Sequence, residues 1–173
     1  MKWIIGAVAV IAALIAIVVV VGMSLPQDHT ATRTARLSQP PERVWEMITN
    51  VAAYPEWRRG VTAVEQLPPH DDNIMWRETS GGDKLTFEAI TSERPSHFVA
   101  RISDRGLPFG GSWDYRIVPE GSGSRLTITE NGEVYNPVFR FVSRYIMGHT
   151  ATIDKYLTDI ATKLGDTYTP ASG

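Results

Sequence analysis

The sequence predicts an α+β protein in which a curved antiparallel sheet of about seven strands wraps a long C-terminal helix, with a separate transmembrane helix at the N-terminus. Three patterns support this prediction. Residues 61–135 alternate apolar and polar side chains between turn signals. Residues 137–164 carry apolar side chains at helical spacing, and residues 3–23 contain no charge. The 173 residues suffice for one domain beside an anchor.

The apolar run from Trp3 to Met23 is long enough to cross a membrane once. At about 1.5 Å per residue it spans roughly 32 Å as a helix, close to the ~30 Å hydrocarbon core of a bilayer. A cleaved signal peptide would have an apolar core of about 7–15 residues and a small-residue cleavage site, and this run has neither. We therefore expect an uncleaved, single-pass anchor over residues 1–25, held in the membrane through residues 3–23.

The charges that flank the apolar run give conflicting indications of the side of the membrane on which the domain lies. Lys2 and the terminal amine favour a cytoplasmic N-terminus, whereas three arginines after the apolar run favour the opposite orientation (Arg33, Arg36 and Arg43). An N-terminal anchor ahead of a large domain usually acts as an export signal, and the nearest charge after it is Asp28. We expect an extracytoplasmic domain.

Composition excludes several classes of function. The 43% hydrophobic content argues against disorder, and 17 Lys and Arg against 19 Asp and Glu argue against nucleic-acid binding. No cysteine is available for a disulfide or thiolate site, and the four histidines are scattered without metal-ligand spacing. Phosphate-loop and G-x-S-x-G motifs are absent. We expect neither a metal nor a cofactor.

The predicted elements follow one another without an internal repeat. A strand over residues 30–37 leads into a helix that begins near Pro40 and Pro41. A short second helix follows over residues 50–57. Six strands come next, separated by Gly- and Pro-containing turns, over residues 61–67, 73–79, 84–92, 97–103, 111–118 and 124–135.

Alternation assigns one row of each strand to the dry face of the sheet. The strands over 73–79, 84–92, 97–103, 111–118 and 124–135 contribute in turn Ile74, Trp76 and Glu78; Leu85, Phe87 and Ala89; Phe98, Ala100 and Ile102; Trp113, Tyr115 and Ile117; and Leu126, Ile128 and Glu130. The cover for this face is predicted to be one helix from Pro137 to about Leu164, about 42 Å long at helical rise. The domain thus extends over residues 26–166, with a flexible tail over 167–173.

The order of strand, two short helices, six strands and long helix resembles the START-like, or SRPBCC, superfamily with its helix-grip fold. The residues that carry the resemblance are SQPPERVWEMITNVAAYPEWRRGV at 38–61 and WDYRIVPEGSGSRLTITENGEVYNP at 113–137. The superfamily includes polyketide cyclases and dehydrases and lipid-transport proteins. The resemblance implies a cavity between the sheet and the terminal helix that accepts a hydrophobic ligand.

The candidate ligand-binding residues lie on the predicted dry face and around its opening. They are Trp57, Trp76, Phe87, Trp113, Tyr115, Glu130, Tyr145 and His149. Trp57, beside Arg58 and Arg59, occupies a position that the resemblance suggests as a lid. Core packing is the competing interpretation for each aromatic residue. Glu78, Glu130 and His149 are polar residues on apolar rows, and a buried carboxylate against the histidine could act as an acid/base pair. The alternative is that the two glutamates lie near strand ends and reach water or a backbone amide, while His149 hydrogen-bonds locally.

Three functions remain open from the sequence. The first is a membrane-anchored protein that binds or transports a hydrophobic, lipid-like molecule without catalysis or cofactor. The second is an aromatase/cyclase- or dehydratase-type enzyme that uses Glu130 or His149 on a polyketide-like substrate. The third is a protein-interaction module in which the cavity is vestigial.

Overall fold

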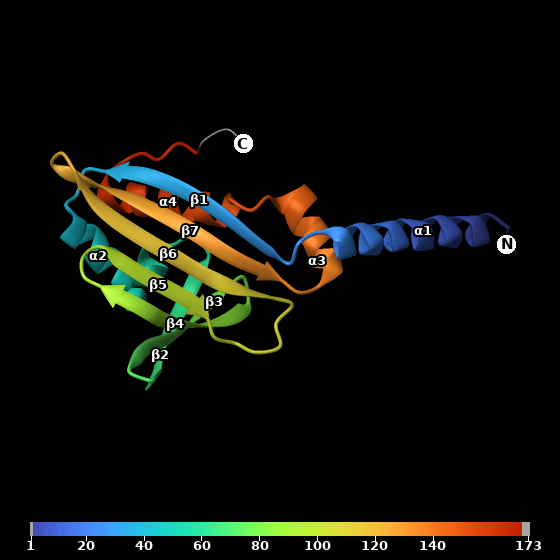
Figure 1. Ribbon diagram of the computed structural model, residues 1–173, viewed down its shortest axis with the longest axis horizontal. Helices are drawn as coiled ribbons and strands as arrows, with labels where there is room; N and C mark the ends of the chain where they lie inside the picture. The colour runs from blue at the N-terminus through green and yellow to red at the C-terminus, as the bar shows by residue number, and fades with distance from the viewer. Residues whose placement is uncertain (1, 171–173) are drawn as a thin grey trace.

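The computed structural model describes residues 2–170 and shows a helix-grip α+β fold behind an N-terminal helix (Figure 1). Helix α1 (Lys2–Ser24) projects away from the sheet, and it is long and apolar enough to cross a membrane. The domain contains seven strands and five short helical elements among its described residues. In chain order they are β1 (Asp28–Leu37), α2 (Pro41–Thr49), η1 (Val51–Glu56), β2 (Val61–His70), β3 (Asn73–Ser80), β4 (Asp83–Glu93), β5 (His97–Ile102), β6 (Phe109–Glu120), β7 (Gly123–Val134), α3 (Pro137–Val142), η2 (Ser143–Met147) and α4 (Ala151–Leu164).

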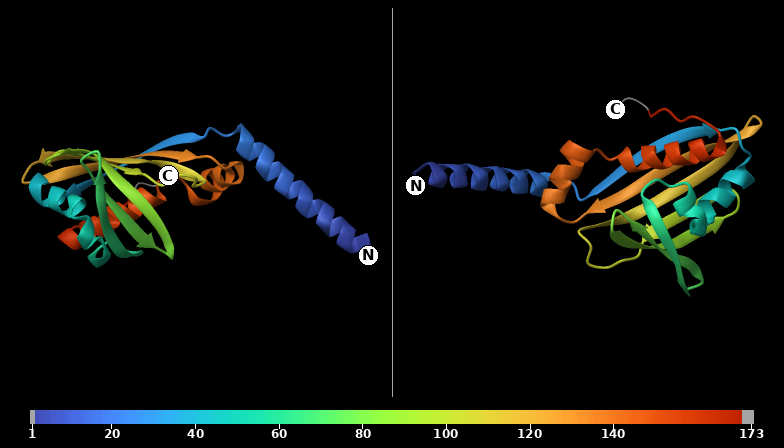
Figure 2. Two further views of the ribbon diagram at one scale, coloured as in Figure 1. Left: turned by 90° about the horizontal axis from the view of Figure 1, so that it is seen from below. Right: turned by 180° about the vertical axis from the view of Figure 1, so that it is seen from behind.

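The sheet is antiparallel throughout, in the order β1-β7-β6-β5-β4-β3-β2. Its first two strands therefore occupy opposite edges, and α2 and the 3-10 helix η1 connect them. Pro41 takes the first helical position of α2, where a missing amide hydrogen costs nothing. Helices α2 and α4 cover one face of the curved sheet (Figure 2).

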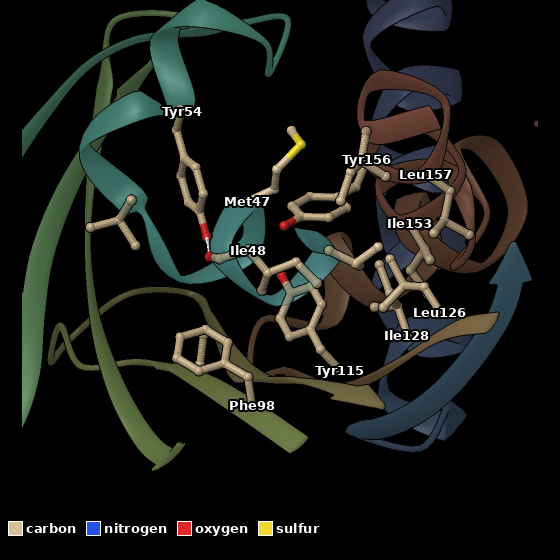
Figure 3. Packing of buried hydrophobic residues seen from close by; sticks show 14 of the residues in the cluster. Met47, Ile48, Tyr54, Phe98, Tyr115, Leu126, Ile128, Ile153, Tyr156 and Leu157 are labelled. Atoms are coloured by element: carbon tan, nitrogen blue, oxygen red, sulfur yellow. Dashed lines mark hydrogen bonds between the residues drawn. The ribbon is translucent and has the colours of Figure 1, made fainter. Parts of the chain in front are cut away.

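The core lies between that face and the two helices. Leu126 and Ile128 of β7 are buried against Ile153 and other residues of α4 (Figure 3). The predicted inward rows are otherwise buried or partly buried, but Ile74 is exposed near the β2–β3 turn. On the outer face, Glu88 is buried beneath Arg101 and Asn73, which donate hydrogen bonds to it.

The sequence predicts one unbroken helix from Pro137 to about Leu164, and this prediction is wrong. The segment divides into α3, the π-helix η2 and α4, with a break at Gly148, whose φ is 75°. Glycine adopts this left-handed conformation at little cost. Of these three elements α4 covers the sheet, whereas α3 turns away to pack against α1. The apolar stripe continues through the break and therefore conceals it.

Helix α1 is tied to the domain at its last turns. Gly22 lies so close to the carbonyl of Pro137 that a Cβ atom would overlap it. The Arg140 guanidinium donates to the carbonyl oxygens of Leu25, Val134 and Tyr135, at 3.3, 2.7 and 3.0 Å. The end of α1, the end of β7 and α3 are thus joined by one side chain.

The predicted flexible tail is described only as far as residue 170. Within it, Tyr168 packs against the core and donates a hydrogen bond to Asp154 Oδ1 at 2.7 Å. Residues 171–173 of the predicted tail lie outside the described residues.

Candidate functional site

Aromatic side chains from both walls fill the interior beneath the sheet. The Trp76 ring stacks against Phe87 and Phe98, with centroids 5.5 and 6.4 Å apart. Tyr156 of α4 meets Tyr115 of β6 at 5.4 Å, and it meets Trp57 at the same distance. The open cavity expected between sheet and helix is therefore occupied by the protein's own rings.

Two hollows of the described structure lie away from this interior. One, of about 150 Å³, lies at the edge of the sheet and is lined by residues 72–74 of the β2–β3 turn and β3 and by residues 89–92 of β4. Another runs along residues 2–11 on the outside of α1. A ligand beneath the sheet would therefore have to displace aromatic side chains.

A polar cluster is enclosed within this aromatic interior. Arg58 Nη1 donates to Glu78 Oε1 and Oε2 at 2.9 and 3.0 Å, and Trp76 Nε1 donates to Oε1 at 2.9 Å. The Arg58 guanidinium also lies 4.5 Å from the centre of the Tyr54 ring and 5.0 Å from that of Tyr156. We call Tyr54, Arg58, Trp76, Glu78, Tyr115 and Tyr156 the tyrosine–arginine cluster.

The electrostatics of the cluster favour a charged pair among neutral phenols. Burial disfavours the Arg58 cation, but attraction to Glu78 and to the tyrosines outweighs it and raises the pKa of Arg58. Burial raises the pKa of Tyr54, Tyr115 and Tyr156 above the ordinary value of 10.0. All three hydroxyls therefore stay protonated at neutral pH and are available as hydrogen-bond donors.

The hydroxyls of Tyr54 and Tyr156 differ in their hydrogen bonding. Tyr54 donates to the carbonyl of Ile48 at 2.6 Å. The buried hydroxyl of Tyr156 lies near the hydroxyls of Tyr54 and Tyr115, but it makes no hydrogen bond of good geometry within the described residues. The Tyr156 residue is only 7% exposed. Figure 3 shows the oxygens of Tyr54, Tyr115 and Tyr156 turned toward the same part of the core. A buried hydroxyl without a partner costs about 1–3 kcal/mol.

A second polar group lies where α4 begins. Trp113 Nε1 donates to Glu130 Oε2 at 3.0 Å, and His29 Nε2 lies 3.4 Å from Glu130 Oε1. The His29 and His149 rings are tilted by 31° with centroids 4.0 Å apart. Ser143 Oγ lies 3.2 Å from His149 Nδ1. We call Glu130, His29, His149 and Ser143 the histidine chain.

The histidine chain brings together a carboxylate, two imidazoles and a hydroxyl. Glu130 does not touch His149 directly, because His29 of β1 lies between them. Burial, followed by the charges of His29 and Arg144, lowers the pKa of His149 from its ordinary value of 6.5. A neutral His149 can accept a proton, so the arrangement can hold and pass protons.

Six of the eight predicted site residues fall into three places. Trp76 and Tyr115 belong to the tyrosine–arginine cluster, and Glu130 and His149 belong to the histidine chain. Phe87 and Trp113 lie between the two groups, with ring centroids 5.9 Å apart.

The other two predicted site residues, Trp57 and Tyr145, do not lie where the sequence predicts them. Trp57 is not at a surface lid but is 8% exposed in the core, where it meets Tyr54 edge to face. Its neighbour Arg58 turns inward, while Arg59 binds Asp159 of α4. Tyr145 is 60% exposed on η2, because the terminal helix turns away there.

Sequence reasoning missed Tyr54, Arg58, Tyr156 and His29 as site residues. The sequence places Arg58 beside the expected lid residue Trp57, and it gives His29 no role. A usable signal existed for Arg58, since Glu78 is an inward carboxylate that needs a buried cation. His29 had no comparable signal, because its contact depends on the pairing of β1 with β7.

The arrangement suits an apolar molecule with a hydrogen-bonding oxygen better than it suits a metal. Aromatic walls would take the apolar part, and the Tyr156 hydroxyl would donate to the oxygen. Within residues 2–170, no group of three or more His, Asp or Glu side chains is placed to hold a metal ion.

Comparison with known proteins supports the fold in two ways. The family model described as "polyketide cyclase / dehydrase and lipid transport" matches residues 28–164. No curated protein sequence matches the chain significantly. Solved structures with low sequence identity share the architecture.

Three of these structures illustrate the likeness. The Zhui aromatase/cyclase from Streptomyces sp. R1128 has a TM-score of 0.63 at 13% identity, over 80% of this chain and 94% of its own. A START superfamily protein from Mycobacterium smegmatis has a TM-score of 0.60 at 15% identity, over 79% of this chain and 97% of its own. The ginseng (Panax ginseng) major latex-like protein 151 has a TM-score of 0.62 at 8% identity, over 81% of this chain and 97% of its own. At these identities the likeness shows the fold alone.

Proposed function

Because the chain belongs to the polyketide cyclase / dehydrase and lipid transport family, we propose that it binds a hydrophobic, lipid-like molecule beneath its sheet. The ligand's apolar part replaces aromatic contacts in the interior, and its oxygen accepts a hydrogen bond from Tyr156. The domain works as a carrier or sensor tethered to the membrane by α1, without a cofactor.

The observation that carries this proposal is the unpaired Tyr156 hydroxyl. A protein that only packed its core would gain by placing phenylalanine there, since an unpaired buried hydroxyl is destabilising. The surrounding walls are aromatic, and aromatic rings bury large apolar area against a ligand. The charge of Arg58 is already balanced by Glu78, which favours a neutral oxygen in the ligand, such as a carbonyl or ether.

Tethering fits such a ligand physically. A molecule that partitions into a bilayer is concentrated at its surface, and α1 would hold the domain there. We place the domain on the extracytoplasmic side. Reporter fusions at the C-terminus test this placement, and a fusion active only in the cytoplasm would reverse it.

Native mass spectrometry of the full chain, released from detergent micelles in the gas phase, tests ligand binding. We expect about one apolar molecule retained per chain, and several-fold lower occupancy in Tyr156→Phe, since one hydrogen bond contributes about 1 kcal/mol.

The matched control for this experiment is Tyr168→Phe. It removes a phenol hydroxyl that binds Asp154 outside the interior, so occupancy should not change. A chain that is empty in every preparation contradicts the proposal. An empty chain that retains a protein partner supports an interaction module instead.

The histidine chain favours a second function, an aromatase/cyclase- or dehydratase-type reaction on a polyketide-like substrate. Glu130 and His29 would adjust the proton affinity of His149, which would remove or deliver the proton. Turnover of a polyketide-like β-ketone by the full chain, and its loss in Glu130→Gln and His149→Gln, tests this function. Turnover that survives both substitutions excludes the histidine chain as its acid and base.

A further inference from the structure

Exposed apolar side chains gather at one place on the domain. Beyond α1, most of the large exposed apolar residues lie in or beside α3 and η2: Phe109, Tyr135, Val138, Phe139, Tyr145 and Ile146. Phe139 is 51% exposed and Ile146 is 72% exposed. A patch of this kind marks an interaction surface. We call residues 137–147 the α3–η2 segment.

The α3–η2 segment is amphipathic in sequence. Val138, Phe139, Val142, Tyr145 and Ile146 are spaced by one, three, three and one residues, which places them along one side of a helix. Arg140 and Arg144 are four residues apart and lie on another side. Phenylalanine, tyrosine and isoleucine beside arginines are typical of helices that lie in a membrane interface.

The depth of the segment follows from its contact with α1. Residues 2–17 of α1 are all exposed, whereas Val18, Val19, Val21 and Gly22 are partly or fully covered. Helix α1 packs against α3, and Gly22 touches Pro137. The stretch from Val18 to Met23 rises about 7.5 Å along the helix. Interfacial helices bury their apolar face by about 5–10 Å, so the two depths agree.

The position of the segment is fixed by the domain. Arg140 bonds the carbonyl of Leu25, just after α1, and two carbonyls at the end of β7. The Asn136 side chain accepts hydrogen bonds from the backbone amides of Val138 and Phe139 and so caps α3. When α1 spans a bilayer, α3 is therefore held beside its last turns.

From these observations we infer that the α3–η2 segment docks on the lipid bilayer as a second, interfacial contact beside the anchor. The inference rests on the membrane tether of the proposed function and extends it. Its occupant is the bilayer, because the exposed patch is continuous with the end of α1. The histidine chain includes Ser143 of η2, so this docking places that end of the interior next to the lipid.

The chain has no cysteine, so single labels can be introduced without background. We would place a fluorophore on the full chain at Ile146→Cys, Val10→Cys or Ile74→Cys, and reconstitute it in phosphatidylcholine vesicles. Quenching would be measured with phosphatidylcholine brominated at shallow or deep acyl positions, and with aqueous iodide. All three sites are more than half exposed, so labelling should leave the fold intact, which circular dichroism checks.

We expect brominated lipid to quench the Val10 and Ile146 labels. The Ile146 label should be quenched more strongly by shallow bromines than by deep ones. The Ile74 label should respond to iodide alone, with several-fold less lipid quenching than Ile146. If Val10 is quenched while Ile146 behaves like Ile74, the interfacial contact is excluded and the anchor stands. If Ile146 is shielded from both quenchers, protein covers the segment and the inference is wrong. If Val10 is not quenched by lipid, the membrane tether itself fails, and the inference with it.

Discussion

Arg58 donates two hydrogen bonds to Glu78 inside the aromatic core, at 2.9 and 3.0 Å. The side chain of Glu78 is 7% exposed and that of Arg58 is 21% exposed. A buried pair of this kind contributes little net stability, but removing one partner strands the other charge. The pair thus ties the turn that follows the 3-10 helix η1 to strand β3, beneath the rings of Tyr54 and Tyr156.

Breaking this pair from one side should be costly. We predict that Arg58→Met lowers the free energy of unfolding by about 3 kcal/mol, because Glu78 then keeps only Trp76 as a donor. The double variant with Glu78→Gln should recover much of that loss, since no buried charge remains. Urea unfolding of the full chain in detergent, followed by tryptophan fluorescence, measures both.

The exposed pair of Arg43 and Glu46 on α2 provides the control. Arg43→Met should cost less than about 1 kcal/mol, as surface ion pairs do. Equal losses for Arg43→Met and Arg58→Met would mean that the inner pair is not desolvated.

Two tyrosine-to-phenylalanine substitutions should change stability in opposite directions. Tyr156→Phe removes an unpaired buried hydroxyl and should raise the free energy of unfolding by about 1 kcal/mol. Tyr54→Phe removes a hydroxyl that binds the Ile48 carbonyl and should lower it by about 1 kcal/mol. The same urea titration compares them. A loss in both variants would show that Tyr156 has a partner in the ligand-free protein.

The histidine chain should make the protein less stable in acid. The pKa of His149 is lowered on folding by burial, by His29 and by Arg144. The unfolded chain therefore binds the proton more tightly. Stability is fully present above the ordinary pKa of 6.5 and is lost as the pH falls through the lower folded value.

Substitution of His149 should reduce this dependence on pH. Between pH 7.5 and 5.5, His149→Gln should show a smaller drop in the urea midpoint than the unsubstituted chain. The groups that face His149 are His29, Arg144 and Ser143, with Glu130 behind His29. His70→Gln on the exposed end of β2 is the control. If His149→Gln leaves the loss of stability in acid unchanged, other groups cause that loss.

The contact between α1 and α3 should depend on one glycine. A Cβ atom at Gly22 would overlap the Pro137 carbonyl, whereas Gly6 has nothing within 4 Å. Gly22→Leu should therefore displace α3 and speed hydrogen exchange of its amides several-fold. Gly6→Leu adds the same side chain to the same helix and should leave exchange unchanged. Equal exchange in both variants would contradict close packing at Gly22.

The terminal segment shows where prediction from sequence reached its limit. Apolar residues recur from Val138 to Leu164 at helical spacing, and a single glycine inside such a pattern is often tolerated. The break at Gly148 follows from tertiary contacts, because α3 packs on α1 while α4 packs on the sheet. Tyr145 was therefore placed in the interior, although it is exposed on η2.

The sequence predicted which side chains are buried better than it predicted which polar side chains pair with one another. Alternation correctly placed Trp76, Phe87 and Tyr115 inside, because an apolar row must face away from water. It also placed Glu78 and Glu130 inward, but it could not name their partners. Arg58 lies 20 residues from Glu78, and His29 lies 101 residues from Glu130.

By itself, the sequence determined the apolar helix, the antiparallel sheet and the covering helix. These depend on local periodicity, which backbone hydrogen bonding and burial impose over a few residues. The tertiary structure decided which polar groups meet in the interior and how the end of α1 is held. Those contacts depend on the register of β1 against β7 and on helix packing, and so they join residues whose separation along the chain carries no local signal.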